Sequence, residues 1–314
     1  MTTALITHPA CLDHAPPPGH PESPNRLRAV LRALEAPEFE GLVRIEAPLA
    51  DRTALLRAHD ESEIEGILGH YAQEAARDGY SHIDADTAMS PGSAQAALRA
   101  AGAVMAGVDE IVAGGVRNTF CAVRPPGHHA ERARAMGFCL FNNIAVGALH
   151  ARAAHAFRRI AAIDFDVHHG NGTQDIFYDD ADLFYASTHQ YPFYPGTGRT
   201  SETGVANNIV NAPLPAGADG RAFYAAFDNL VLPALDRFAP DFIFISAGFD
   251  AHRLDPLAQL RLTEIDFAWA TAEICKIAAR HCGGRVVSAL EGGYDLEALA
   301  SSAAAHVRAL MNAA

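Results

Sequence analysis

The sequence lacks the cysteine patterns that stabilise many small secreted or zinc-binding domains. It contains only five cysteines, an odd number, scattered along 314 residues with no Cys-x-x-Cys pair. This distribution excludes a disulfide framework and a structural zinc knuckle. We therefore predict reduced thiols in an intracellular protein.

Long apolar runs and targeting segments are also missing from the sequence. No stretch approaches the roughly 18 apolar residues of a membrane span, and no basic segment followed by an apolar one opens the chain. No repeat, low-complexity tract or Gly/Ser-rich linker separates one part from another. We expect a cytoplasmic protein without a membrane partner, formed by one domain over residues 1–314.

Basic residues are few, since 24 Lys and Arg face 37 Asp and Glu, which gives a formal charge of −13. Such a field repels phosphates, so the composition argues against a nucleic-acid partner and favours neutral or cationic ones. Apolar residues make up 49% of the chain, enough for a sizeable core. The 16 histidines exceed what this composition requires.

Short β-branched or aromatic runs alternate with longer alanine-rich segments of helical spacing. The runs predict strands at residues 119–123, 159–165, 183–187, 242–246 and 285–290. The longer segments predict helices at residues 24–36, 61–77, 93–112, 142–157, 219–238, 263–281 and 296–311, with Ser23-Pro24 and Ser90-Pro91 as starts. This alternation predicts an α/β domain whose mostly parallel sheet is covered by helices on both faces.

Four predicted strands are followed by polar side chains beside glycine. These segments are residues 124–129, 166–172, 247–252 and 291–295. Ligands of such sheets bind beyond the carboxyl ends of the strands. The sequence thus predicts an active site assembled from these four segments.

Asp164, Asp166 and His168 alternate along an extended segment, which places their side chains on one face. Two carboxylates and an imidazole can bind one divalent ion, and Asp250 after another strand could supply a further ligand. Three protein ligands leave positions open for water and substrate. The alternative is that the aspartates cap a loop and His168 is an ordinary polar residue.

Other residues at these strand ends suit proton transfer. The pair His128-His129 follows Pro-Pro-Gly, and two neutral imidazoles there suit general acid and base work near neutral pH. The hydroxyl of Tyr294, after two glycines, could stabilise an oxyanion. Surface decoration for the histidines and simple packing for the tyrosine are the alternatives.

Many short motifs, in order and spacing, resemble the zinc-dependent histone deacetylase family, including its bacterial deacetylase-like and acetylpolyamine amidohydrolase members. They lie at residues 19–27, 86–93, 124–130, 137–143, 164–172, 194–198, 246–251 and 291–294. The resemblance implies the arginase–deacetylase fold, a single domain with an eight-stranded mostly parallel sheet. It also implies a hydrolase that removes acetyl or other acyl groups from acyl-lysine.

The resemblance also implies site roles. Zn²⁺, with Fe²⁺ as the alternative in the cell, would be held by Asp166, His168 and Asp250. The catalytic residues would be His128, His129, Tyr294, Asp164 and Asn171, with His129 as general base, Asp164 beside His128 and Asn171 beside His129. Asparagine there is typical of the class II branch and should keep the second histidine neutral.

Two further sets follow from the resemblance. A structural K⁺ would be bound by Asp164, Asp166, His168, Ser187 and the backbone of Thr188. A narrow substrate tunnel would be lined by Gly137, Phe138, Tyr194 and Leu257. Arg26 matches a position near an internal cavity behind the metal, or is a helix-surface arginine.

The nearest alternative activity is hydrolysis of acetylpolyamines or other small acylamides. Leu257 stands where the polyamine-selective eukaryotic branch has a glutamate, which weakens that alternative, and Leu254 replaces a common glycine. A dimanganese ureohydrolase would need an Asp-Ala-His-x-Asp segment, whose last aspartate is missing after His168. A non-enzymatic acyl-lysine- or metal-binding protein, or a regulator of the acetoin-utilisation type, is disfavoured by the intact His128, His129 and Tyr294.

Overall fold

The computed structural model describes residues 2–314, and its centre is a sheet of eight strands that all run parallel. The strand order is β2-β1-β5-β10-β9-β6-β7-β8. Their bounds are β1 Thr3–Thr7, β2 Val43–Glu46, β5 Asn118–Cys121, β6 Ile160–Asp164, β7 Leu183–Gln190, β8 Ile209–Leu214, β9 Phe242–Ala247 and β10 Val286–Leu290. A separate antiparallel pair joins β3 Ser81–His82 to β4 Ala88–Met89. The predicted α/β sheet is confirmed.

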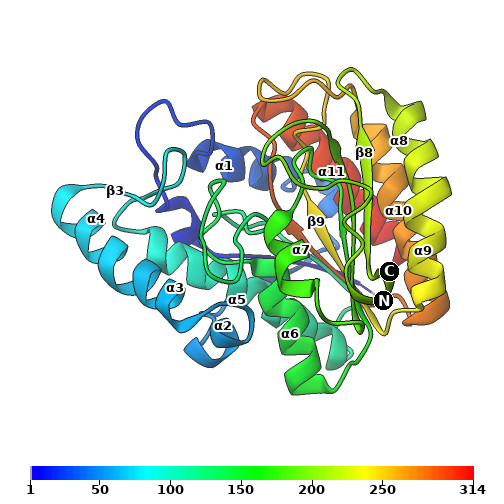
Figure 1. Ribbon diagram of the computed structural model, residues 1–314, viewed down its shortest axis with the longest axis horizontal. Helices are drawn as coiled ribbons and strands as arrows, with labels where there is room; N and C mark the ends of the chain where they lie inside the picture. The colour runs from blue at the N-terminus through cyan, green and yellow to red at the C-terminus, as the bar shows by residue number, and fades with distance from the viewer. Residues whose placement is uncertain (1) are drawn as a thin grey trace.

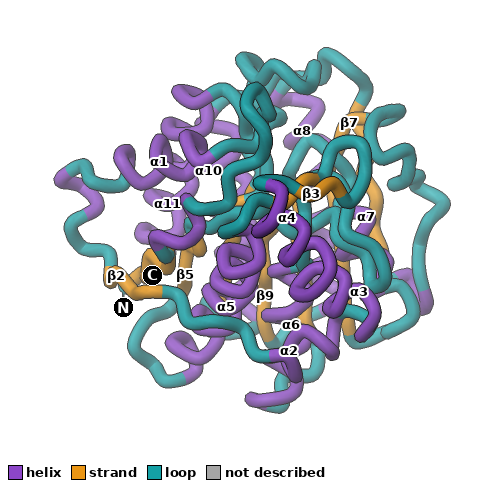
Figure 2. Tube along the Cα trace, turned by 90° about the vertical axis from the view of Figure 1, so that its left-hand side faces the viewer, coloured by secondary structure: helices purple, strands orange, loops and turns teal. Residues whose placement is uncertain are grey.

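Helices cover both faces of the sheet (Figure 1). One layer contains α2 Arg52–Ala58, α5 Ser93–Val112, α6 Asn143–His155 and α7 Asn171–Phe177, which pack on one another and on the central strands. The other contains α1 Pro24–Ala33, α8 Gly220–Ala226, α9 Leu232–Phe238, α10 Glu264–His281 and α11 Leu296–Ala313. Figure 2 shows the strands between these layers.

The remaining helical segments are short. They are α3 Glu61–Glu65, α4 Ala72–Asp78, the 3₁₀ turns η1 Pro9–Leu12, η2 Pro37–Phe39 and η4 Val205–Asn207, and the π-helical turns η3 Gly66–Tyr71 and η5 Phe227–Val231. The two predicted helices at residues 61–77 and 219–238 thus each contain a π-helical turn. The predicted start at Ser90-Pro91 is wrong, because these residues form a turn and α5 begins at Ser93.

Burial explains which strands could be recognised. Every residue of β5, β6, β9 and β10 is buried, as expected for parallel strands covered on both faces. The pairing register sets Asp164, the last residue of β6, opposite Ser246 of β9, which ends one residue later, so these two strands end at nearly the same level. The segments that follow them therefore emerge together at the carboxyl edge of the sheet.

Two sequence-based expectations concern the chain as a whole. All five cysteines are buried and free of disulfide bonds. Among residues 2–314, no helix combines the length and apolar character that a membrane span requires.

Candidate active site

The four strands with polar carboxyl ends are neighbours in the sheet, in the order β5-β10-β9-β6. Their following segments meet above the sheet centre and carry His128 and His129, Tyr294, Asp250, and the pair Asp166 and His168. The structure thus brings the four segments together, as the sequence predicts. The polar side chains come together because adjacent parallel strands end at the same edge.

Asp166, His168 and Asp250 form a compact group whose ligand atoms all lie within 4.8 Å of one another. His168 Nδ1 lies 3.1 Å from Asp166 Oδ1 and 3.2 Å from Asp250 Oδ2. The two aspartates are 0% and 1% exposed, whereas His168 is partly accessible. One edge of the group is therefore open to a pocket.

Backbone amides orient both carboxylates. Val167 N–H donates to Asp250 Oδ1 at 2.8 Å, and Gly292 N–H donates to Asp166 Oδ2 at 2.8 Å. Gly292 also allows a close approach, since a Cβ at this position would lie 2.0 Å from Asp250 Oδ2. The positions of these ligands depend on three separate chain segments.

The chemistry of this group fits a divalent cation. Burial, and then the negative charge of Asp166, raises the pKa of Asp250 to about 7, so two buried carboxylates face each other without sufficient positive charge. Two carboxylate oxygens and one imidazole nitrogen are suitable zinc ligands and leave room for other ligands. Asp166, His168 and Asp250 are therefore a group that could hold such an ion.

His128 and His129 lie beside this group, with ring centroids 4.0 Å apart. His128 Nδ1 is 3.0 Å from Asp164 Oδ2, which also accepts from the Tyr185 hydroxyl. Burial opposes a charge on His128, but the carboxylates of Asp166 and Asp164 outweigh it and raise its pKa well above the ordinary value. This direction for His128 differs from the expectation of two neutral imidazoles.

His129 has a different partner and the opposite tendency. Its Nδ1 lies 2.8 Å from Asn171 Oδ1, while Asn171 Nδ2 donates to Glu131 Oε1 at 2.7 Å, which sets the orientation of the amide. Burial, and then the neighbouring His128 and His168, lowers the pKa of His129 well below the ordinary value. The Nε2 of a neutral His129 is then free to accept a proton.

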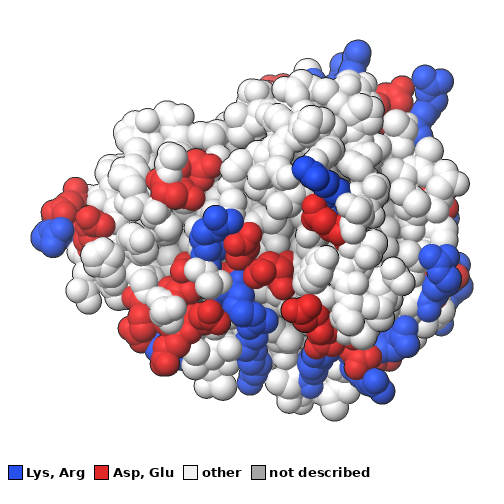
Figure 3. Space-filling view, in the orientation of Figure 1, with Lys and Arg blue, Asp and Glu red and all other residues white. Residues whose placement is uncertain are grey.

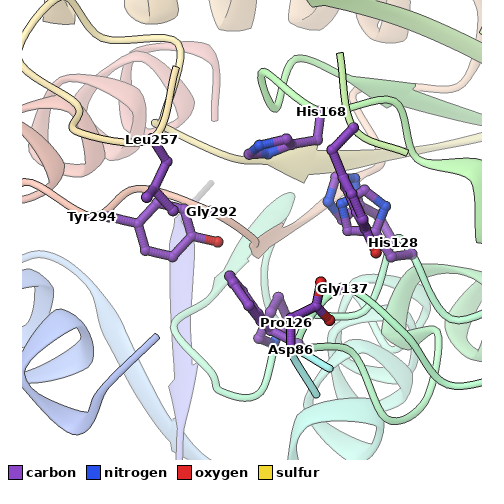
Figure 4. Close-up of a pocket in the computed structure, with 11 residues that line it drawn as sticks. Asp86, Pro126, His128, Gly137, His168, Leu257, Gly292 and Tyr294 are labelled. Carbon is purple, nitrogen blue, oxygen red and sulfur yellow. The ribbon is translucent and has the colours of Figure 1, made fainter. Parts of the chain in front are cut away.

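The partly accessible side of the group opens into a narrow, mainly apolar pocket with a cavity volume of about 80 Å³. Figure 4 shows the Tyr294 hydroxyl facing the same space as the rings of His168 and His128. The pocket is lined by Asp86, Pro126, His128, His129, Gly137, Phe138, His168, Tyr194, Leu257, Gly292 and Tyr294. All four residues expected to line a tunnel are in this set, and Asp86, Pro126 and Gly292 are additions.

Tyr294 is held in place from several directions. Its backbone N–H donates to Asp255 Oδ2 at 2.7 Å, and the Arg26 guanidinium lies 4.8 Å from the centre of its ring. Arg26 is fully buried and donates to the carbonyls of Gly293 and Glu291, so it is not a surface arginine. These contacts therefore fix the position of the loop that carries the Tyr294 hydroxyl.

Glu291 is a buried carboxylate without a predicted role. Its Oε2 accepts from Gly127 N–H at 2.6 Å and from His128 N–H at 3.2 Å, and its Oε1 accepts from the Ser246 hydroxyl at 3.2 Å. Burial raises its pKa to about 7. The signal available in the sequence is an acidic residue directly after a mostly apolar strand.

The residues expected to bind K⁺ are only partly gathered by direct contacts. Ser187 lies opposite Asp164 across β6 and β7, but its hydroxyl is 2.9 Å from His189 Nδ1. Thr188 is buried beside it. The K⁺ site stays a prediction.

Fold and site together define a class of α/β protein that carries a candidate metal-ligand group and paired histidines at the carboxyl edge of a parallel sheet. A family model described as the histone deacetylase domain matches residues 20–310, and the chain belongs to the histone deacetylase family. Its fold is the arginase–deacetylase fold. A crystal structure of the HDA15 HD domain superposes with a TM-score of 0.93 at 37% identity, covering 99% of this chain and 88% of that one.

Curated relatives agree with this assignment. Histone deacetylase 14, chloroplastic, from Arabidopsis thaliana is 43% identical over 93% of this chain and 73% of its own length. A histone deacetylase-like amidohydrolase from Pseudomonas aeruginosa is 38% identical over 88% of this chain and 73% of its own length. The cytoplasmic location stays a prediction, since the plant relative is named for another compartment.

Proposed function

We propose that the protein is a zinc-dependent hydrolase that removes acetyl or other acyl groups from the side-chain amine of acyl-lysine. The observation that carries this proposal is the convergence of one metal-ligand group, a neutral histidine and a tyrosine hydroxyl on one narrow apolar pocket. Amide hydrolysis needs an activated water, a base and a donor for the carbonyl oxygen, and these groups can supply all three.

The ion held by Asp166, His168 and Asp250 would lower the pKa of a bound water and polarise the acyl carbonyl. His129 accepts a proton from the attacking water through Nε2, and the Asn171 amide keeps its ring oriented. Tyr294 donates a hydrogen bond to the carbonyl oxygen as negative charge develops there. As the carbon–nitrogen bond breaks, a protonated histidine of the pair gives its proton to the leaving amine, which yields a free amine and a carboxylate.

The pocket supports a linear acylated amine as substrate. Phe138, Tyr194 and Leu257 provide apolar contact for an extended aliphatic chain, and the Phe138 ring packs edge-on against Tyr294 at 5.9 Å. Asp86 adds one carboxylate to the lining. A lysine side chain in an extended conformation would place its acyl group at the paired histidines.

The test compares acetyl-lysine peptides with acetylputrescine and acetylspermidine, using wild type, Tyr294→Phe and His129→Ala. We expect the peptides to have the higher kcat/KM, and each variant to lose roughly 10²–10³-fold in kcat while keeping its metal. Metal content is measured on the same samples. Full activity in either variant would refute the assigned roles, and a preference for the polyamines would identify a small-acylamide hydrolase.

A further inference from the structure

A second group of metal-ligand side chains lies away from the active site, between α5 and α6. It consists of Asp109 of α5 and His150 and His155 of α6, whose ligand atoms all lie within 4.8 Å of one another. His150 Nε2 is 2.8 Å and His155 Nε2 is 2.6 Å from the same oxygen, Asp109 Oδ1. The two imidazoles approach this oxygen with their rings nearly perpendicular, at 84°.

We propose that Asp109, His150 and His155 bind a divalent transition-metal ion such as Zn²⁺. Two imidazole nitrogens and one carboxylate oxygen are a recognised ligand set for such ions, which leave the remaining positions to water. The three atoms already converge, so small side-chain rotations would allow each to reach the roughly 2.0–2.2 Å of a metal–ligand bond. This proposal does not depend on the proposed hydrolase activity.

The position in the fold favours a cation. His155 is the last residue of α6, and Asp109 lies in the last turn of α5. The carbonyl ends of both helices, which carry partial negative charge, therefore lie near the group. The Arg152 guanidinium, also in the last turn of α6, is paired with Asp180. Figures 1 and 2 both show α5 and α6 side by side.

Accessibility also suits an exchangeable ion. The side chains of His150, His155 and Asp109 are 12%, 23% and 52% exposed, so the imidazoles are held in place while the carboxylate reaches solvent. Both helices end shortly before a strand begins, which places the group at the amino edge of the sheet, opposite the active site. An ion here would join the ends of α5 and α6 without touching the substrate pocket.

The chain offers a matched contrast at Asp236. There one carboxylate oxygen also has two nitrogen partners, His281 Nε2 at 2.7 Å and the Arg280 guanidinium at 2.8 Å. A guanidinium cannot bind a metal ion, because it has no free lone pair at physiological pH. His281→Ala therefore removes a surface His–Asp pair without removing a metal ligand.

The test measures Zn²⁺ bound per chain at micromolar free Zn²⁺, by equilibrium dialysis and elemental analysis, on protein without a histidine tag. We expect His155→Ala and His150→Ala each to bind one equivalent less than wild type, with unchanged activity, while His281→Ala matches wild type. The difference between variants is one equivalent whatever the catalytic group holds. Equal stoichiometry in wild type and His155→Ala would overturn the proposal, as would an equal loss in His281→Ala.

Discussion

At the scale of single residues, two adjacent histidines have partners of different chemistry, a carboxylate for one and an amide for the other. Asp164 accepts from His128, whereas the amide oxygen of Asn171 faces His129. The sequence predicts both imidazoles to be neutral, because the unperturbed pKa of histidine lies near neutrality. The outcome for His128 depends on two carboxylates gathered by the fold, and adjacency in the sequence carries no information about their distance.

Glu291 illustrates a positioning residue and leads to a first prediction. Replacing Glu291 with Ala would leave the buried N–H groups of Gly127 and His128 without an acceptor, which costs about 1–3 kcal/mol for each unsatisfied group. The loop that carries the paired histidines should then shift. A displacement of about 1 Å can reduce turnover about 10²-fold, so we expect kcat to fall by about that factor with little change in KM.

The conservative variant Glu291→Gln provides the control for this prediction. Its side-chain oxygen can still accept from the two N–H groups, and its NH₂ can donate to the Ser246 hydroxyl. We expect Gln to restore most of kcat and of the melting temperature. If Ala keeps wild-type kcat, or if Gln is as damaging as Ala, Glu291 does not act by holding this loop.

At the scale of elements, five of the six interior strands could be predicted, whereas β1 and the edge strands β2 and β8 could not. Buried parallel strands such as β6 and β9 are continuous apolar runs that stand out in a sequence. The edge strand β2 has the sequence Val-Arg-Ile-Glu and is mostly exposed, and β8 contains Pro213, so neither has that signature. The short helix α7 begins inside the glycine-containing motif after His168, and none of the predicted helices covers it.

The segment after β10 shows how an element places ligands, and it gives a prediction at Gly292. A Cβ there would lie 2.0 Å from Asp250 Oδ2 and 2.6 Å from Asp166 Oδ2. Both contacts are far shorter than van der Waals distance, so Gly292→Ala must push the two carboxylates out of position. We expect loss of the catalytic metal and of activity, measured by elemental analysis and turnover.

Gly41→Ala is the matched control for this substitution. Gly41 is exposed, and a Cβ at this position meets only Met311, at 3.9 Å. Metal content and turnover should remain at wild-type values in this variant. Retention of both in Gly292→Ala would show that the loop yields without disturbing the ligands.

At the scale of the whole molecule, the charge of −13 is not gathered into one field on the face shown in Figure 3. Acidic and basic side chains lie interspersed there. Many charged side chains of the molecule form pairs, such as Arg52 with Glu61 and Arg152 with Asp180. Salt screening limits the range of the electrostatic interactions of such surface charges to about 8–10 Å. The net charge therefore gives only a weak preference for cationic acylamines, and the pocket itself must determine specificity.

The proposed metal ligands also connect the site to the stability of the whole fold. Asp166 follows β6 and Asp250 follows β9, and without a cation their buried carboxylates repel each other across the centre of the sheet. A ligand that binds only the folded chain stabilises it by about 4 kcal/mol at a thousand times its Kd. We therefore expect chelation of the catalytic metal to lower Tm by roughly 10 °C, reversibly on adding Zn²⁺. Calorimetry in the His155→Ala background keeps the surface group from contributing.

The control is Asp250→Asn, which removes one of the two charges and keeps an oxygen that accepts from Val167 N–H. Without metal, this variant should have a higher Tm than the metal-free protein that keeps Asp250, and added Zn²⁺ should change its Tm little. Identical melting with and without Zn²⁺ in the Asp250 protein would contradict this coupling, because it would mean that the folded chain gains nothing from binding the ion.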